Sequence, residues 1–306
     1  METLTFVLSG TLIAATPLLI AALGELVAEK AGVLNLSIEG MMALGAAIAF
    51  ITVTTTGSYW LALLTGGLAA VLLAALFAAV VLFALGNQVA TGLAVGILGV
   101  GLAGLIGKPY DSMTVAPMPR LPIPFLSDLP VVGRGLFDHV ALVYVAPIAA
   151  VGLWWMFRHS KLGLVLRAAG ESPETTHAIG YNVIAVRFLA VLFGGFMAGV
   201  AGGFISIASA TLWSDGLIAG RGWIVIALVV FGTWRAERVA IGAYLFGFAT
   251  IGELLVQSTG LAVPSQLLTS IPYIATIAAI ALLSMDGRRV RLNAPVSLGR
   301  VYRETQ

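Results

Sequence analysis

The sequence predicts an all-α membrane protein, a polytopic bundle of about 8–10 transmembrane spans with a helical cytoplasmic loop. The chain of 306 residues is 59% hydrophobic and only 10% charged, and its mean hydropathy is +1.03. Residues 40–107 contain no Asp, Glu, Lys or Arg, so this run can hold about three spans of ~20 residues each. A polar island at 158–187 interrupts the apolar sequence and indicates a segment outside the lipid.

Apolar runs separated by short polar connections mark the expected spans. The first run lacks a basic N-terminal region and is long for a signal peptide, which favours a retained span. A short run at 222–234 suggests a tight hairpin with the next run, turning at Trp234–Arg238. The runs are 4–24, 40–56, 59–85, 88–106, 139–157, 187–210, 222–234, 239–257 and 266–285.

Lys and Arg gather in alternate connections and so predict the orientation, because short cytoplasmic loops carry the excess of basic residues. The island has four Lys/Arg against two Glu, the 234–238 turn has two Arg, and the tail at 286–306 has five Arg. By contrast, the loop at 107–138 balances three basic residues with three Asp. We therefore expect the island, the turn and the C-terminal tail in the cytoplasm, and the 107–138 loop outside.

The side of the N-terminus stays open. Nine spans counted back from a cytoplasmic C-terminus place the N-terminus outside and put Glu25, Glu29, Lys30 and Glu39 at the inner end. Acidic residues weigh little in the orientation rule, so this acidic cluster is compatible with a cytoplasmic position. A re-entrant segment near the start would instead place the N-terminus inside.

The outer loop at 107–138 is rich in proline. The spacing in PMPRLPIP favours extended, polyproline-like backbone. Two roles fit this loop: a stiff strap over the outer face, or a docking surface for a protein that delivers a solute.

Polar residues at membrane depth are the first candidates for a solute pathway. Asn35, Ser37 and Glu39 lie just before or inside a span, where polar groups are costly unless they are paired or line a cavity. Broken helices in transporters expose polar groups in this way. The alternative is a helix start, with Asn35 as the cap and Glu39 near the positive helix end.

A second pair of candidates, Asn87 and Gln88, opens the run at 88–106. These residues are either interfacial caps or hydrogen-bonding groups that line the pathway. Glu253 and Gln257 share a helical face. This suggests a carboxylate that is paired between helices, with a proton relay as the alternative.

Small and aromatic residues point to packing rather than chemistry. The glycine-rich stretches Gly92–Gly104 and Gly194–Gly203 are typical of helices that approach closely in lipid. Trp213, Trp223 and Trp234 fit the aromatic belts at the membrane interfaces.

The island reads as two short helices, Leu162–Ala169 and Glu174–Ile179, with a break at 170–173 and an end at Gly180. Two short helices of this kind suit binding by a cytoplasmic partner protein. The rest of the chain offers no catalytic pattern: it has no cysteine, no phosphate-binding loop, and histidines without metal-ligand spacing. We therefore expect no enzyme activity, no cofactor or metal, and no nucleic-acid partner.

Several stretches resemble one family, the permease subunits of ATP-binding-cassette importers in the branched-chain amino acid and simple-sugar superfamily. The resemblance covers about residues 24–285 and is strongest to the nucleoside and simple-sugar uptake branch, through the glutamate in NLSIEGMM. The matching stretches are EKAGVLNLSIEGMMALGA, NQVATGLAVGILGVGLAG, the island with the helix after it, and GRGWIVIALVVFGTWRA.

This resemblance implies one permease domain, residues 1–306, in a bacterial-type cytoplasmic (inner) membrane. ATP and Mg²⁺ would bind only to a partner ATPase, whose groove would receive the island and drive alternating access. A second permease, in a heterodimer or a homodimer, and an extracytoplasmic solute-binding protein would complete the importer. The coupling residues that the resemblance implies are Arg167, Gly170, Glu171, Pro173 and Gly180.

Two other classes compete with an importer of nucleosides or simple sugars. An ion-coupled secondary transporter needs buried acids, for which Glu39 and Glu253 are candidates, but it leaves the island unexplained. A membrane enzyme or scaffold needs a convergent catalytic set, which the sequence lacks. A bundle with few charges suits neutral, hydroxyl-rich solutes.

Overall fold

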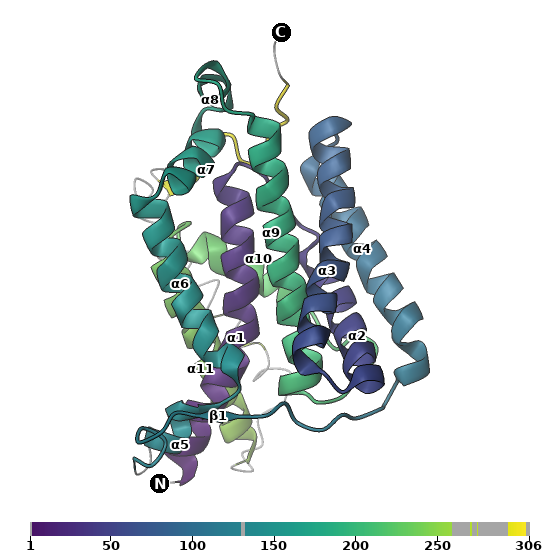
Figure 1. The fold of residues 1–306 in the computed structure, drawn as a ribbon, viewed down its shortest axis with the longest axis vertical. Coiled ribbons are helices and arrows are strands. Elements are labelled where there is room, and N and C mark those ends of the chain that lie inside the picture. The colour runs from purple at the N-terminus through teal and green to yellow at the C-terminus, as the bar shows by residue number, and fades with distance from the viewer. Residues whose placement is uncertain (1, 130–131, 259–269, 271–273, 275–292, 304–306) are drawn as a thin grey trace.

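The computed structural model describes residues 2–129, 132–258, 270, 274 and 293–303. These residues form a helical bundle with very little strand (Figure 1). Seven described helices are long and apolar enough to cross a membrane. They are α1 (Glu2–Lys30), α2 (Ile38–Thr56), α3 (Tyr59–Ala78), α4 (Gln88–Gly107), α6 (Ala141–His159), α9 (Val183–Phe204) and α11 (Ala236–Ser258).

The expected spans match these helices with two differences. The first helix continues to Lys30 instead of ending at residue 24, and its added residues Glu25 and Glu29 are fully buried. Helix α10 (Arg221–Phe231) has 11 residues, so it is about 16 Å long and shorter than the ~30 Å hydrocarbon core. The expected run at 266–285 falls outside the described residues, apart from residues 270 and 274.

Close glycine contacts hold the centre of the bundle, where α2 and α3 pack against α9. A Cβ atom on Gly202 of α9 would lie 1.9 Å from the Met42 carbonyl oxygen, and one on Gly199 would lie 2.4 Å from the Gly66 carbonyl oxygen. No side chain fits at these crossings. Close packing is therefore what the glycine-rich stretch at 194–203 provides.

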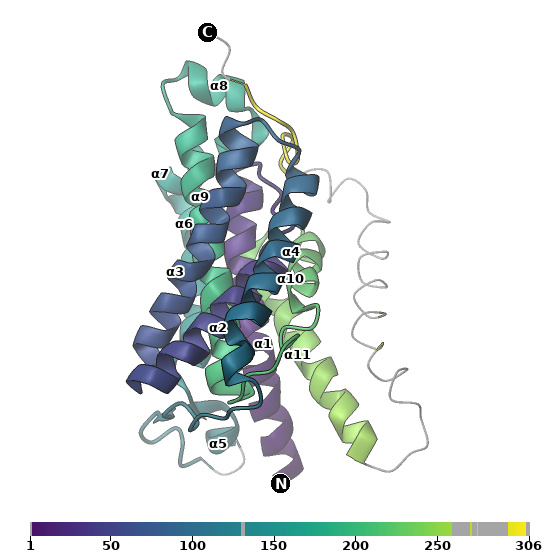
Figure 2. The same cartoon turned by 90° about the vertical axis from the view of Figure 1, so that its right-hand side faces the viewer.

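The two long connections lie at opposite ends of the bundle. The loop after α4 carries strand β1 (Leu121–Pro122), the short helix α5 (Val132–Phe137) and strand β2 (Asp138–His139), and β1 pairs antiparallel with β2. In Figure 1 this loop crosses the end where the N-terminus lies. Helices α7 (Lys161–Glu171) and α8 (Pro173–Ala178) lie at the other end, beside residues 293–303 (Figures 1 and 2). The start of α1 and residues 293–303 thus lie at opposite ends of the bundle.

Candidate functional site

The polar island folds as the two helices α7 and α8, but the break between them is shorter than expected. Helix α7 runs through Gly170 to Glu171, and only Ser172 separates it from α8. Ser172 is extended, at φ −146° and ψ 84°, because the residue before a proline avoids the helical region. Gly180 adopts φ +92°, which favours glycine, and turns the chain toward α9.

Gly170 is the contact point between α7 and the bundle. A Cβ atom at this position would lie 2.2 Å from the carbonyl oxygen of Lys30, so only glycine lets α7 approach the end of α1 this closely. The carbonyl oxygen of Gly170 accepts two hydrogen bonds from Ser297, from its backbone N–H at 3.0 Å and its hydroxyl at 2.6 Å. Gly170 therefore joins α7 to both α1 and the C-terminal segment.

Arg187, at the start of α9, reinforces this joint from inside. Its side chain is fully buried and donates from Nε to the carbonyl oxygen of Ala31 at 3.0 Å. Its Nη2 donates to the carbonyl oxygen of Ala169 at 3.1 Å and to the hydroxyl of Ser297 at 2.7 Å. One guanidinium thus ties α1, α7, α9 and the C-terminal segment together, which we call the Arg187 joint.

Several side chains of the island are exposed. Arg167, Glu171 and Gly180 are exposed, while Pro173 begins α8 and is buried with Gly170. The Nε of Arg167 donates to the carbonyl oxygen of Gly163 at 3.3 Å, which leaves its remaining guanidinium N–H groups for other contacts. The island therefore combines a buried attachment with an exposed polar surface.

A second polar group lies in the linker between α1 and α2. The Asn35 backbone N–H donates to Glu25 Oε1 at 3.1 Å, and Asn35 Oδ1 accepts from both the backbone N–H of Ser37, at 3.0 Å, and the Ser37 hydroxyl. All three side chains are completely buried. Asn35 and Ser37 thus satisfy each other and the broken backbone around them.

Gln88 meets this linker from the start of α4, where the neighbouring Asn87 caps the helix. The side-chain oxygen of Gln88 accepts from the Leu34 N–H at 2.8 Å, and its amide donates to the carbonyl oxygen of Arg300 at 3.2 Å. Asn87 is exposed and caps α4 by accepting from the Ala90 N–H at 3.0 Å. We call Asn35, Ser37, Asn87 and Gln88, with the linker they surround, the linker network.

Glu39 has a different environment, at the start of the short helix α10. Its two carboxylate oxygens accept backbone N–H groups at the α10 N-terminus, from Gly220 at 2.7 Å and from Gly222 at 2.6 Å. Glu39 is half-buried, and a Cβ on Gly222 would lie 2.5 Å from the Glu39 Cα. Because α10 is too short to cross the membrane, its N-terminus lies inside the bundle with backbone N–H groups that need acceptors. The Glu39 carboxylate supplies those acceptors and caps the helix.

These contacts lie in a chain whose similarity to known proteins is extensive. The family described as "Branched-chain amino acid transport system / permease component" matches residues 7–283. The chain belongs to this permease family.

Full-length relatives of this permease are named as transport subunits. The putative glucose ABC transporter permease protein of Haloferax volcanii is 38% identical, and the alignment covers 96% of each chain. The nucleoside ABC transporter permease protein of Lactococcus lactis is 30% identical over 92% of this chain and 93% of the relative. The guanosine ABC transporter permease protein of Bacillus subtilis is 30% identical over 98% and 97%. No solved structure matches the permease.

Family membership establishes the general role of the chain. It is a membrane-spanning transport subunit and not an enzyme, and the hydrolysis of ATP belongs to a partner subunit. Such permeases work with an ATPase and a solute-binding protein. Among the described residues, no group of His, Cys, Asp and Glu could hold a metal ion.

Sequence reasoning missed the buried charges of this permease. Arg187 and Ser297 were not singled out, and Trp234, expected in an interfacial belt, is 8% exposed and donates to the Glu29 carboxylate. The available signal was the pair of carboxylates, Glu25 and Glu29, at the end of a long apolar helix. Gln257, by contrast, donates to Glu253 Oε1 at 3.1 Å, within one helical face as expected.

Proposed function

We propose that this permease imports nucleosides or simple sugars, and that α7 and α8 receive the movement of the ATPase. The observation that carries the proposal is the Arg187 joint, which connects an exposed helical segment to two central helices through buried hydrogen bonds. A push on α7 would be transmitted directly to α1 and α9. Rigid elements joined in this way can carry a displacement between distant sites.

The coupling residues divide into two roles in this proposal. Gly170, Pro173 and Gly180 shape the segment: Gly170 permits close approach, Pro173 begins α8, and Gly180 turns the chain. Arg167 and Glu171 are exposed and offer opposite charges to the ATPase groove. On this assignment the α8 end, the C-terminus and the basic tail are cytoplasmic, the 107–138 loop is extracytoplasmic, and the membrane is a bacterial-type cytoplasmic membrane.

The pathway for the solute passes beside α2, α4 and the N-terminus of α10. Glu39 is half-buried at a helix end inside the bundle, which supports contact with a hydroxyl-bearing solute. The buried residues of the linker network, Asn35, Ser37 and Gln88, hold the starts of α2 and α4 in place beside this pathway. The names of the relatives, for glucose, nucleosides and guanosine, favour a neutral hydroxyl-rich solute.

Gentle extraction of the tagged permease from its native membrane, followed by mass spectrometry, tests the assembly. We expect an ATPase and a second, homologous permease in the eluate, since a heterodimer is the proposed form. An ATPase without a second permease would indicate a homodimer instead. A permease that elutes alone and transports solute without ATP would contradict the proposal.

Uptake by the reconstituted complex with its binding protein tests the solute class. We expect ATP-dependent uptake of labelled guanosine, uridine, ribose or glucose. Uptake of leucine in preference to all four would contradict the proposed class while leaving the ATP-driven mechanism intact.

A further inference from the structure

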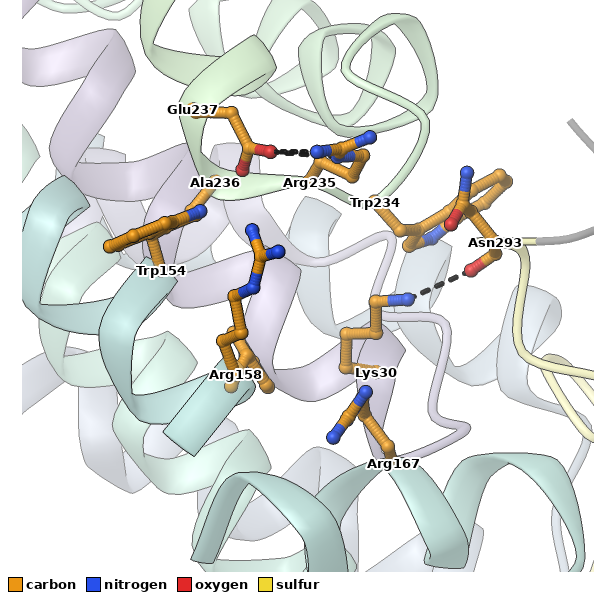
Figure 3. Close-up of a pocket in the computed structure, with 10 residues that line it drawn as sticks. Lys30, Trp154, Arg158, Arg167, Trp234, Arg235, Ala236, Glu237 and Asn293 are labelled. Atoms are coloured by element: carbon orange, nitrogen blue, oxygen red, sulfur yellow. Dashed lines mark hydrogen bonds and ion pairs between the residues drawn. The ribbon is translucent and has the colours of Figure 1, made fainter. Parts of the chain in front are cut away.

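A basic cavity lies beside the coupling helix, at the end of the bundle that carries α8. Its volume is about 280 Å³, and it opens between the ends of α1 and α6, the middle of α7, and the turn from α10 to α11. Figure 3 shows the side chains of Lys30, Arg158 and Arg167 around one space, with Arg235 across from them. Four different helical segments thus bring a cation to the same cavity.

The positive charge of this cavity is mostly uncompensated. Among the described residues of the lining, Glu237 is the one carboxylate, and its Oε1 accepts from Arg235 Nε at 2.7 Å. Within the part of the chain that the structure describes, Lys30, Arg158 and Arg167 form no ion pair. The Nζ of Lys30 instead donates to the carbonyl oxygen of Asn293 at 2.8 Å.

Two acidic residues lie close to Lys30 in the fold without belonging to the lining. Glu29 precedes it in α1, and Glu171 follows Gly170, whose added Cβ would lie 2.2 Å from the Lys30 carbonyl oxygen. Convergent like charges repel one another in a partly enclosed space. An anion in this cavity would remove that repulsion.

Aromatic side chains form the apolar part of the lining. Trp154 and Phe157 come from the last turns of α6, Trp234 comes from the α10–α11 turn, and the Arg158 guanidinium lies 5.7 Å from the centre of the Trp154 ring. Tryptophan gathers at the headgroup level of membranes, where an apolar body and a polar edge are both satisfied. The cavity therefore combines basic donors with an interfacial aromatic wall at the ends of two spans.

We propose that this cavity binds the phosphate of an anionic phospholipid headgroup. Guanidinium groups match phosphate oxygens with paired N–H donors, and basic pockets between membrane helices recognise such headgroups. The position at the span ends favours a lipid phosphate over a phosphate dissolved in water. A headgroup bound here would bridge α6, α7 and the α10–α11 turn, and so would brace the helix that carries Arg167.

Native mass spectrometry of the purified full-length permease, with the subunits that accompany it, tests the proposal. Phosphatidylglycerol and phosphatidylcholine are titrated separately, and the fraction of permease with bound lipid is measured. We expect tighter binding of phosphatidylglycerol, and about a tenfold or greater loss of that binding in Arg158→Gln/Arg235→Gln. Lys161→Gln is the control, because it removes a positive charge from an exposed position on α7 outside the cavity lining, one charge where the double variant removes two.

Competition distinguishes the sources of the phosphate. Inorganic phosphate at millimolar concentration should not displace phosphatidylglycerol more than sodium chloride of equal ionic strength does. Displacement by phosphate alone would overturn the lipid assignment and leave an anion site for a soluble phosphate.

Unchanged phosphatidylglycerol binding in the double variant, with its melting temperature preserved, would overturn the proposal altogether. If that variant instead lost the ATPase subunit, the cavity would belong to a protein contact. These results do not depend on which solute the permease carries, so failure here is separable from failure of the proposed function.

Discussion

The linker network and the island are both polar, yet most polar side chains of the network are buried, whereas those of the island are largely exposed. In the linker network, Asn35 and Ser37 are fully buried and bond to each other and to the backbone. In the island, Arg167 and Glu171 are exposed on a helix that Gly170 fixes to the bundle. A polar side chain satisfied within the chain stabilises one arrangement, whereas an exposed one is free to meet a partner.

This difference separates residues that maintain the bundle from residues that can transmit movement. Changes in the buried set should lower the free energy of unfolding, with transport lost as a consequence. Changes on the exposed face of α7 should leave that free energy nearly unchanged while transport falls. The variants below test that separation, beginning with the largest expected effect on stability.

Arg187→Met should have the largest effect, because it leaves the carbonyl oxygens of Ala31 and Ala169 buried without their Arg187 donor and removes the bond to the Ser297 hydroxyl. We expect a loss of about 3–4 kcal/mol of unfolding free energy. The measurement is thermal or denaturant unfolding of the purified permease. Arg120→Met is the control, since its ion pair with Asp138 is at the other end and largely exposed, and it should cost at most about 1 kcal/mol.

Gly170→Ala should follow, because the new methyl group would lie 2.2 Å from the Lys30 carbonyl oxygen and would push α7 away from α1. We expect a loss of about 1–3 kcal/mol and reduced uptake. Gly152→Ala on α6 is the matched control, because nothing lies within 4 Å of its added Cβ. Equal melting temperatures for these two variants would contradict the close α7–α1 contact.

Glu39→Leu removes the acceptor for two backbone N–H groups at the start of α10 and should cost about 2–3 kcal/mol. Glu39→Gln keeps one side-chain oxygen and should cost about half as much. Uptake measured beside stability sharpens the comparison. If Glu39→Gln keeps its melting temperature but loses uptake, Glu39 contacts the solute. If melting temperature and uptake both stay normal, Glu39 neither stabilises α10 nor contacts the solute.

Asn87→Ala should have the smallest effect on stability of these variants, about 1 kcal/mol, because it removes only the cap of α4. Uptake by the reconstituted complex should stay near that of the unmodified permease. A strong loss of uptake with normal stability would move Asn87 from the supporting network to the solute pathway.

The spans and the two island helices could be predicted because their signals are local. Long apolar runs define α2, α3 and α4, and Pro173 separates α7 from α8. The continuation of α7 through Gly170 was not predicted, because a Gly-Glu-Ser-Pro sequence is typical of a turn. Here the missing side chain serves a close contact with Lys30, which no local pattern records.

Long-range partners explain the rest of what the sequence did not reveal. Arg187 and Ser297 are 110 residues apart, and Glu29 and Trp234 are 205 apart, so neither bond leaves a spacing signal. The bond between Asn87 and the Ala90 N–H supports the cap among the two functions offered for Asn87, and uptake by Asn87→Ala tests the other. Whether a charged side chain is buried depends on tertiary contacts. The sequence shows only that such a residue lies near the end of a span.

Arg167→Ala/Glu171→Ala tests most directly the claim that α7 transmits the movement of the ATPase. In vesicles containing the whole complex, solute uptake and solute-stimulated ATP hydrolysis are measured together with the melting temperature of the purified permease. We predict normal stability with at least about a tenfold loss of both activities, since a tenfold change needs only ~1.4 kcal/mol of lost coupling. Lys161→Ala, exposed on the same helix, should retain both activities. Normal uptake and normal stimulation in the double variant would contradict the account.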